Sequence, residues 1–247
     1  MRIDNTGRVI DFEEKPARPL AIPGRDDRAL ASMGIYAASI DVLDRLLARD
    51  ADDPASCHDF GHDILPRALA DGLLAVHHFD AGCVRAAGQA VYWRDVGTVD
   101  AYWAAQMDLV AIQPAFNLYN VQWPIRTGYN HDPPAKFVFN EDGPGGKRRM
   151  GYATNSLVSE ACIISGGHVN RSVLGPRVRV NSYAEVEASI LHEGVDIGRY
   201  CRLRACIIDK NVRVPAGTVI GYDHEADARR FQVTDGIVVI PKGFDFG

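Results

Sequence analysis

The 247-residue sequence has few cysteines, no long apolar run and no excess of positive charge. Its five cysteines are an odd number and form no Cys-x-x-Cys pair, which argues against a disulfide framework and a four-sulfur zinc site. No stretch approaches the roughly eighteen apolar residues that a membrane helix needs. The formal charge of −5 argues against general nucleic-acid binding. These absences leave an ordinary globular protein as the expected class.

The opening residues, MRIDNTGRVIDFEEKP, contain neither a basic leader nor an apolar signal core. Together with the lack of a membrane segment, this favours a cytoplasmic location in which the thiols stay reduced. Hydrophobic residues make up 47% of the chain and charged residues 24%. Its length suits one large domain or two modest ones.

The most regular feature is a hydrophobic repeat of seventeen residues between Ile163 and Ile220. Its three phases are Ile163, Val180, Ile197 and Val214; Val169, Val186, Leu203 and Ile220; and Leu174, Leu191 and Ile208. A helix of period 3.6 would not keep these positions on one face. A parallel β-helix of hexapeptide repeats would, with about three and a half coils. Gly175, Gly198 and Gly221 follow inward aliphatics, and we expect positive φ there.

The rest of the chain predicts an α/β region at residues 1–110, a connector at 111–160, the coil at 161–222 and a tail at 223–247. The expected elements are a hairpin at 2–13, a loop at 19–28, a buried strand at 29–36, helices at 40–48, 61–69 and 98–110, a strand at 73–79, a strand end and turn at 92–98, a tail helix at 223–230 and a last strand at 237–240. Ser39, Asp59 and Thr98 or Asp100 are the expected helix caps.

Glu14, Lys15 and Pro16 stand where the first hairpin ends. A carboxylate beside an ammonium group at a sheet edge can accept sugar hydroxyls and hold a phosphate. Surface pairs of Glu and Lys are common, so the triplet alone favours an ordinary surface pair. Three further motifs at strand or helix ends favour a binding site instead, namely ASMGIY, SCHDFG and YWRDVGT.

With these motifs the sequence resembles the glucose-1-phosphate adenylyltransferases, also called ADP-glucose pyrophosphorylases. The motifs, in order, are EKP, SMGIY, HDFG, YWRDVGT, WPIRT, PPAKFVF, NSLVS, ISGG, SVL, RVRVNS and IIDKN. The resemblance implies part of a Rossmann-like nucleotidyltransferase domain followed by a left-handed parallel β-helix. It also implies an enzyme that makes ADP-glucose and pyrophosphate from ATP and glucose 1-phosphate, in glycogen or α-glucan synthesis.

The resemblance implies roles for single residues. Those that would bind glucose 1-phosphate or ADP-glucose are Glu14, Lys15, Ser32, Asp59, Phe60 and Trp93. Among these, Glu14 and Ser32 would hold sugar hydroxyls and Lys15 the phosphate. Asp95 would be one of two aspartates that hold Mg²⁺, the implied cofactor, which neutralises charge during phosphoryl transfer. Without the resemblance, Asp95 reads as a helix-capping residue.

The sequence also departs from the family. The family's glycine-rich triphosphate loop and its other metal aspartate are not found in these residues, and the glycine-dense loop at 143–146 has no strand before it. We therefore expect the C-terminal part of the enzyme, a fragment or a late-starting reading frame, with an aggregation-prone sheet edge. We expect this chain alone to be inactive.

Two groups of residues have other interpretations. Cys57, His58, Asp59, His62 and Asp63 look like a zinc cluster, but we favour Asp59 as a helix cap. His168 and His192 resemble the acceptor-activating histidines of hexapeptide acyltransferases, but we favour exposed loop positions. A coil acyltransferase, and a non-catalytic effector-binding or assembly module, are the rival functions.

Regulation and assembly are implied by the resemblance as well. Members of the family are tetramers controlled by metabolites. The resemblance therefore implies phosphorylated or carboxylate effectors and a homotetramer, and no nucleic-acid or membrane partner. Lys210 would occupy a basic effector position that is often arginine, a change that loses a bidentate phosphate contact. Weaker effector candidates are Ser165, Gly166 and Arg126.

Overall fold

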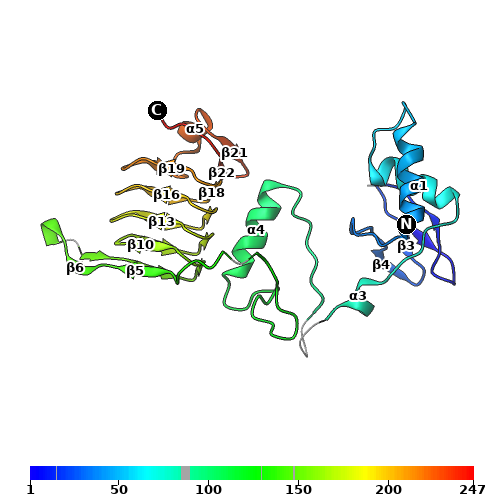
Figure 1. Ribbon diagram of the computed structural model, residues 1–247, viewed down its shortest axis with the longest axis horizontal. Coiled ribbons are helices and arrows are strands. Elements are labelled where there is room, and N and C mark those ends of the chain that lie inside the picture. Colours follow the sequence, from blue (N-terminus) through cyan, green and yellow to red (C-terminus); the bar gives the residue numbers. More distant parts are fainter. Residues whose placement is uncertain (15, 85–89, 129, 147) are drawn as a thin grey trace. The chain divides into compact units, whose positions relative to one another are not determined.

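A computed structural model describes residues 1–14, 16–84, 90–128, 130–146 and 148–247 (Figure 1). The chain divides into two compact units, Met1–Cys83 and Val84–Gly247. None of the described helices has both the length and the hydrophobicity required to span a membrane.

The first unit is built from two hairpins and short helices. Its elements are β1 (Arg2–Ile3), β2 (Val9–Asp11), β3 (Ala21–Ile22), β4 (Arg25–Ala29), α1 (Ile40–Ala51), a π-helical turn (Phe60–Ile64), α2 (Leu65–Ala70) and α3 (Phe79–Gly82). β1 pairs with β2 and β3 with β4, both antiparallel. A small core forms where Leu46 of α1 meets Ile64 and Ala68.

The first unit confirms the helices but not all of the strands. α1 follows Ser39, although the Ser39 side chain makes no capping hydrogen bond. The predicted buried strand at 29–36 is wrong, because the strand ends at Ala29 and Ile35 is 74% exposed. A buried strand needs neighbours on both edges, and β4 pairs only with β3 among the described residues.

Three further expectations are corrected here. The predicted loop at 19–28 is the β3–β4 hairpin, which turns at Pro23 and Gly24, the latter with φ +77°. The predicted strand at 73–79 is reduced to a single bridge between Ala75 and Arg8. Residues 92–98 form no regular strand.

The second unit is a parallel β-helix with one longer helix packed against it and one short helix in its C-terminal tail. Its elements are α4 (Val99–Leu109), β5 (Lys136–Val138), β6 (Asn140–Asp142), a 3₁₀ turn (Pro144–Gly146), β7 (Arg148–Met150), β8 (Tyr152–Thr154), β9 (Leu157–Val158), β10 (Ile163–Ser165), β11 (His168–Asn170), β12 (Val173–Leu174), β13 (Arg179–Val180), β14 (Glu185–Glu187), β15 (Ile190–Leu191), β16 (Asp196–Ile197), β17 (Arg202–Arg204), β18 (Cys206–Ile208), β19 (Arg213–Val214), β20 (Val219–Ile220), α5 (His224–Ala228), β21 (Gln232–Thr234) and β22 (Ile237–Ile240). The expected tail helix and last strand are confirmed as α5 and β22.

Three parallel sheets form the sides of the coil. Their orders are β5-β10-β13-β16-β19, β8-β11-β14-β17-β20 and β9-β12-β15-β18-β22, and β21 lies antiparallel on β22. Figure 1 shows the successive coils stacked, with β5, β10, β13, β16 and β19 of one sheet following one another in that order. The first coil, from β5 to β9, lies inside the residues that the sequence assigned to a connector. The β6–β7 hairpin interrupts this coil, so the seventeen-residue spacing cannot be recognised there. The expectation that no strand precedes the glycine-dense loop at 143–146 is wrong, because β6 ends at Asp142 and the loop connects it to β7.

The inward phases are confirmed except at one residue. Val169 and Leu174 are fully buried, as are their successors in the neighbouring coils. At the start of the first phase, however, Ile164 rather than Ile163 is fully buried and pairs with Val180. Both are isoleucines in one strand, so the apolar pattern does not distinguish between them.

The corners differ from the glycine prediction. Gly221 has φ +83°, as expected, but Gly175 and Gly198 do not have positive φ. Positive φ instead recurs every seventeen residues at 166, 183, 200 and 217, at 171, 188 and 205, and at 177, 194 and 211. Gly198 serves close approach, since a Cβ there would lie 2.5 Å from the backbone nitrogen of Ala216.

Helix α4 covers the outer face of the third sheet. Met107 packs with Ile190 and Ile207, which point away from the coil interior. The indole Nε1 of Trp103 donates a hydrogen bond to the Ala188 carbonyl at 2.8 Å. The expected cap of this helix is confirmed at Thr98, whose hydroxyl accepts from the Ala101 N–H at 3.4 Å.

A ladder of buried hydroxyls runs along one corner of the coil. Ser189 is fully buried, and its hydroxyl accepts the N–H of Cys206 at 3.1 Å and donates to the Glu187 carbonyl at 2.7 Å. Ser172 makes the same contacts one coil earlier, with Ser189 N–H as its donor. The hydroxyls therefore satisfy backbone N–H groups that the sheets leave unpaired.

Replacing Ser189 with alanine should lower the free energy of unfolding by about 1–3 kcal/mol, because the buried Cys206 N–H loses its acceptor. Urea denaturation followed by circular dichroism would measure the change. Ser159→Ala is a matched control, since no hydrogen bond to the Ser159 hydroxyl is found in the described part of the chain. Equal effects of the two substitutions would contradict the role given to the ladder.

Candidate functional site

The first unit brings several of the predicted sugar-binding residues into one chain of contacts. The Ser32 hydroxyl lies 2.8 Å from the Tyr36 hydroxyl. The Tyr36 ring stacks on Phe60 with 5.8 Å between centroids and 8° between planes. Next to Phe60, a Cβ on Gly61 would come within 2.7 Å of a carboxylate oxygen of Glu14. Ser32, Phe60 and Glu14 are thus linked through Tyr36 and Gly61.

Asp59, another predicted sugar-site residue, acts as a helix cap in this unit. The Asp59 carboxylate accepts the N–H of His62 at 2.8 Å and caps the π-helical turn, so the capping role is confirmed. Single π-helical turns are often found at functional sites. Lys15 lies outside the described residues.

Tyr36 and Gly61 join this group although the sequence alone did not assign them a role. Both belong to motifs that were singled out, SMGIY and HDFG. The sequence did contain a signal for Tyr36, because a tyrosine combines an apolar ring with a hydrogen-bonding hydroxyl, and Tyr36 uses both in its contacts with Phe60 and Ser32. Gly61 had none, since its importance lies in its contact with Glu14.

Trp93 and Asp95 lie in the second unit. Trp93 is 47% exposed. The Asp95 Oδ1 accepts the Gly97 N–H at 2.9 Å, whereas Oδ2 has no hydrogen-bond partner among the described residues. Asp95 does not cap α4, because Thr98 does. Mg²⁺ is usually bound by one or two protein carboxylates, and an exposed carboxylate with an available oxygen suits this role.

The proposed effector residues are spread over the second unit. Ser165 is buried at the end of β10, and its carbonyl accepts the Ser182 hydroxyl at 2.9 Å. Gly166 forms the next corner with φ +75°. Lys210 follows β18 in the third sheet and is exposed, with its backbone N–H donating to Asp209 at 2.7 Å. Arg126 borders an open hollow formed by residues 122–126.

The two coil histidines are partly buried, so the expectation of exposed loop positions is wrong. His168 lies in β11, and its Nδ1 is 3.1 Å from the Tyr152 hydroxyl, with the rings 4.2 Å apart. His192 follows β15 with its Nε2 3.5 Å from the Tyr102 hydroxyl. Burial lowers the pKa of His192 below its ordinary value. The sequence did not reveal these tyrosine partners because they are distant along the chain or come from α4.

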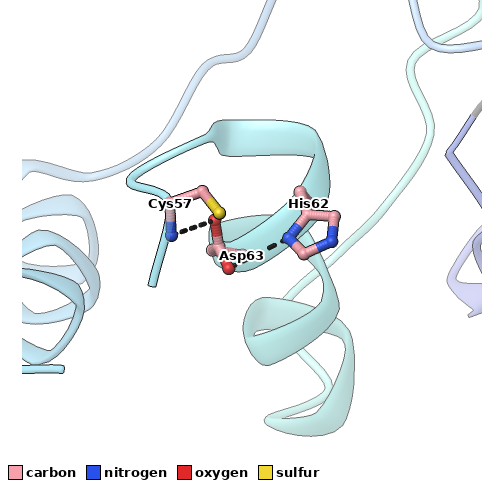
Figure 2. Close-up of side chains that lie close together, drawn as sticks. All are labelled: Cys57, His62 and Asp63. Carbon is pink, nitrogen blue, oxygen red and sulfur yellow. Dashed lines mark hydrogen bonds and ion pairs between the residues drawn. The ribbon is translucent and has the colours of Figure 1, made fainter. Parts of the chain in front are cut away.

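Three of the five residues that look like a zinc cluster in the sequence converge in the structure. Cys57, His62 and Asp63 place one ligand atom each within 4.8 Å of one another (Figure 2). His58 instead directs Nδ1 to Asp50 at 2.8 Å. Burial raises the pKa of Asp63, but hydrogen bonds from the Asp59 backbone and from His62 outweigh it, and the pKa lies below its ordinary value. Asp63 is therefore an anion at neutral pH.

Two family models match the chain. Residues 1–111 match a nucleotidyl transferase model, and residues 133–240 match a GlmU-like, C-terminal hexapeptide model. The first match includes Glu14, Ser32, Phe60 and Asp95. The second corresponds to the parallel β-helix.

Curated relatives match nearly the whole chain. A protein of Anaeromyxobacter sp. is 51% identical over 98% of the chain, one of Methylobacillus flagellatus 49% over 97%, and one of Koribacter versatilis 49% over 98%. Each bears the name glucose-1-phosphate adenylyltransferase. The chain spans 59%, 55% and 57% of their respective lengths.

Proposed function

Because the chain is related over nearly its whole length to glucose-1-phosphate adenylyltransferases, we propose that it acts in the synthesis of ADP-glucose and pyrophosphate from ATP and glucose 1-phosphate. The observation that supports this proposal most strongly is the identity of about half of all residues along both family-model regions. The product would be the glucosyl donor for an α-glucan such as glycogen.

In this proposal the first unit binds glucose 1-phosphate. Glu14 and Ser32 accept or donate hydrogen bonds to sugar hydroxyls, and Lys15 holds the phosphate. Phe60, stacked on Tyr36, offers an apolar edge to the sugar ring. Asp59 contributes mainly by holding the turn that carries Phe60, since its carboxylate is used in the cap.

The remaining roles depend on the resemblance. We propose Trp93 as a sugar contact and Asp95 as a Mg²⁺ ligand; Mg²⁺ would neutralise charge on the transferred phosphates. Effectors with a phosphate or carboxylate, with Lys210, Ser165, Gly166 and Arg126 as candidate contacts, a homotetramer and a cytoplasmic location are proposed on the same ground.

Titration calorimetry with the 247-residue chain tests the sugar-phosphate role. We expect glucose 1-phosphate to bind and Glu14→Gln to weaken binding at least about tenfold, because hydrogen bonds to a charged group contribute roughly 1.5–3 kcal/mol. Glu13→Gln, a change of the exposed neighbouring carboxylate, is the matched control. With ATP and Mg²⁺ added, we expect no ADP-glucose from this chain alone, because no glycine-rich triphosphate loop is found in its sequence.

Three results would overturn parts of this proposal. Equal binding by the two glutamine variants would exclude Glu14 as a sugar contact. Binding of phosphorylated or carboxylate metabolites without any binding of glucose 1-phosphate would favour the effector-binding module instead. Formation of ADP-glucose by the purified chain would refute its expected inactivity.

A further inference from the structure

We propose that Cys57, His62 and Asp63 form a binding site for a thiophilic divalent cation such as Zn²⁺. The cluster combines a thiol, an imidazole and a carboxylate, three different donor groups that face one another (Figure 2). The Asp63 side chain is 9% exposed, whereas His62 is 71% exposed and Cys57 lies at the surface. The site therefore has one fixed inner ligand, the Asp63 carboxylate, and two ligands at the surface, so a cation can reach it from solvent.

The local backbone brings the three ligands together. His62 and Asp63 both lie in the π-helical turn Phe60–Ile64. One oxygen of Asp63 accepts the backbone N–H of Cys57 and of Asp59, each at 3.2 Å, which folds the preceding loop back onto the turn. Because all three ligands come from seven consecutive residues that are already folded, little chain entropy is lost on binding.

The distances suit a tetrahedral ion after a small adjustment. Zn–S bonds of about 2.3 Å and Zn–N or Zn–O bonds of about 2.0–2.2 Å place ligand atoms roughly 3.3–3.6 Å apart. The ligand atoms here lie within 4.8 Å of one another, so an inward movement of about 1 Å or less would suffice. The exposed side chains of Cys57 and His62 can provide it by rotation about χ1 and χ2.

The donor set selects the metal. Thiolate and imidazole ligands favour Zn²⁺ over Mg²⁺ or Ca²⁺, which prefer oxygen. Three protein ligands leave a fourth position for water or another small ligand, as in open zinc sites. Binding would replace the 3.1 Å hydrogen bond between His62 Nδ1 and Asp63 with a bond from each side chain to the cation.

The other thiols do not offer an equivalent site. Cys162, Cys201 and Cys206 are buried in the coil, and burial raises their pKa values, that of Cys206 to about 12. Cys83 is the remaining thiol with solvent access, and it belongs to no cluster of three possible ligands among the described residues. It therefore provides a matched control.

Zn²⁺ titration of the full 247-residue chain, read by competition with a chromophoric chelator, tests the proposal. Cys57→Ser and His62→Gln should each weaken Zn²⁺ binding at least about tenfold, whereas Cys83→Ser should not change it. Co²⁺ should give a thiolate-to-metal charge-transfer band that Cys57→Ser removes and Cys83→Ser retains. Zn²⁺ should also slow alkylation of Cys57 but not of Cys83.

Absence of Zn²⁺ binding to the unmodified chain, or equal binding by Cys57→Ser and Cys83→Ser, would overturn the proposal. Circular dichroism of each variant checks its fold, and Cys57 and His62 are exposed, so we expect no loss. Glucose 1-phosphate binding measured with a chelator present tests the proposed function separately, because that experiment does not require the zinc site.

Discussion

Replacing Gly221 with alanine should destabilise the coil by more than about 4 kcal/mol, the range reached only by severe local conflicts. Gly221 follows β20 with φ +83°, and a Cβ there would lie 1.8 Å from the carbonyl oxygen of Arg204 in β17. That oxygen is backbone, so the clash can be relieved only by separating two stacked coils. The backbone N–H of Gly221 donates a hydrogen bond to the Asp227 carboxylate at 2.8 Å, which fixes the corner further.

Gly217→Ala distinguishes the clash from the cost of positive φ. Gly217 has φ +77°, but a Cβ added there would meet no other part of the described chain within 4 Å, so only about 1–2 kcal/mol of backbone strain is expected. Urea denaturation of both variants, followed by circular dichroism, provides the comparison. Equal losses of stability in the two variants would mean that the close approach of Gly221 to the Arg204 carbonyl is not needed for stability.

Replacing Leu191 with alanine should lower the free energy of unfolding of the coil by about 2–5 kcal/mol. Leu191 is fully buried in β15, where it pairs with Leu174 on one side and Ile208 on the other. Coils of a solenoid are stabilised mainly by their neighbours, so a cavity in a central coil weakens two contacts at once.

Val219→Ala is the control for this cavity. Val219 also lies in a coil strand, β20, but is 50% exposed, so its truncation should change stability by only about 0.5 kcal/mol or less. Chemical denaturation monitored by the β-sheet circular dichroism signal would measure both variants. A loss at Val219 as large as that at Leu191 would refute the assignment of Leu191 to the core.

The sequence predicted the coil well because its information is local and repeated. The positions of Val169 and Leu174 recur in each coil, and every coil needs a buried aliphatic side chain there, so each repeat supports the prediction of the others. The first coil was not recognised because the β6–β7 hairpin breaks that spacing. Corners such as Tyr183 and Tyr200 were missed since positive φ at non-glycine residues is imposed by the stacking of coils, not by local preference.

The first unit was predicted less well for a physical reason. The run from Ala29 to Tyr36 has the composition of a buried strand, but composition cannot reveal whether partner strands are present. The candidate site shows the same limit. Its motifs identified Ser32 and Phe60, whereas the link between them through Tyr36 depends on tertiary contacts.

The packing of α4 on the third sheet affects how this protein could recombine with its relatives. The helix lies in the region matched by the nucleotidyl transferase model, yet its Met107 covers Ile190 and Ile207 of the hexapeptide region. A chimaera joined after residue 111 would pair a foreign helix with this apolar surface. An exchange joined before Val99 would keep the helix and its sheet together, so functional crossovers should be concentrated there.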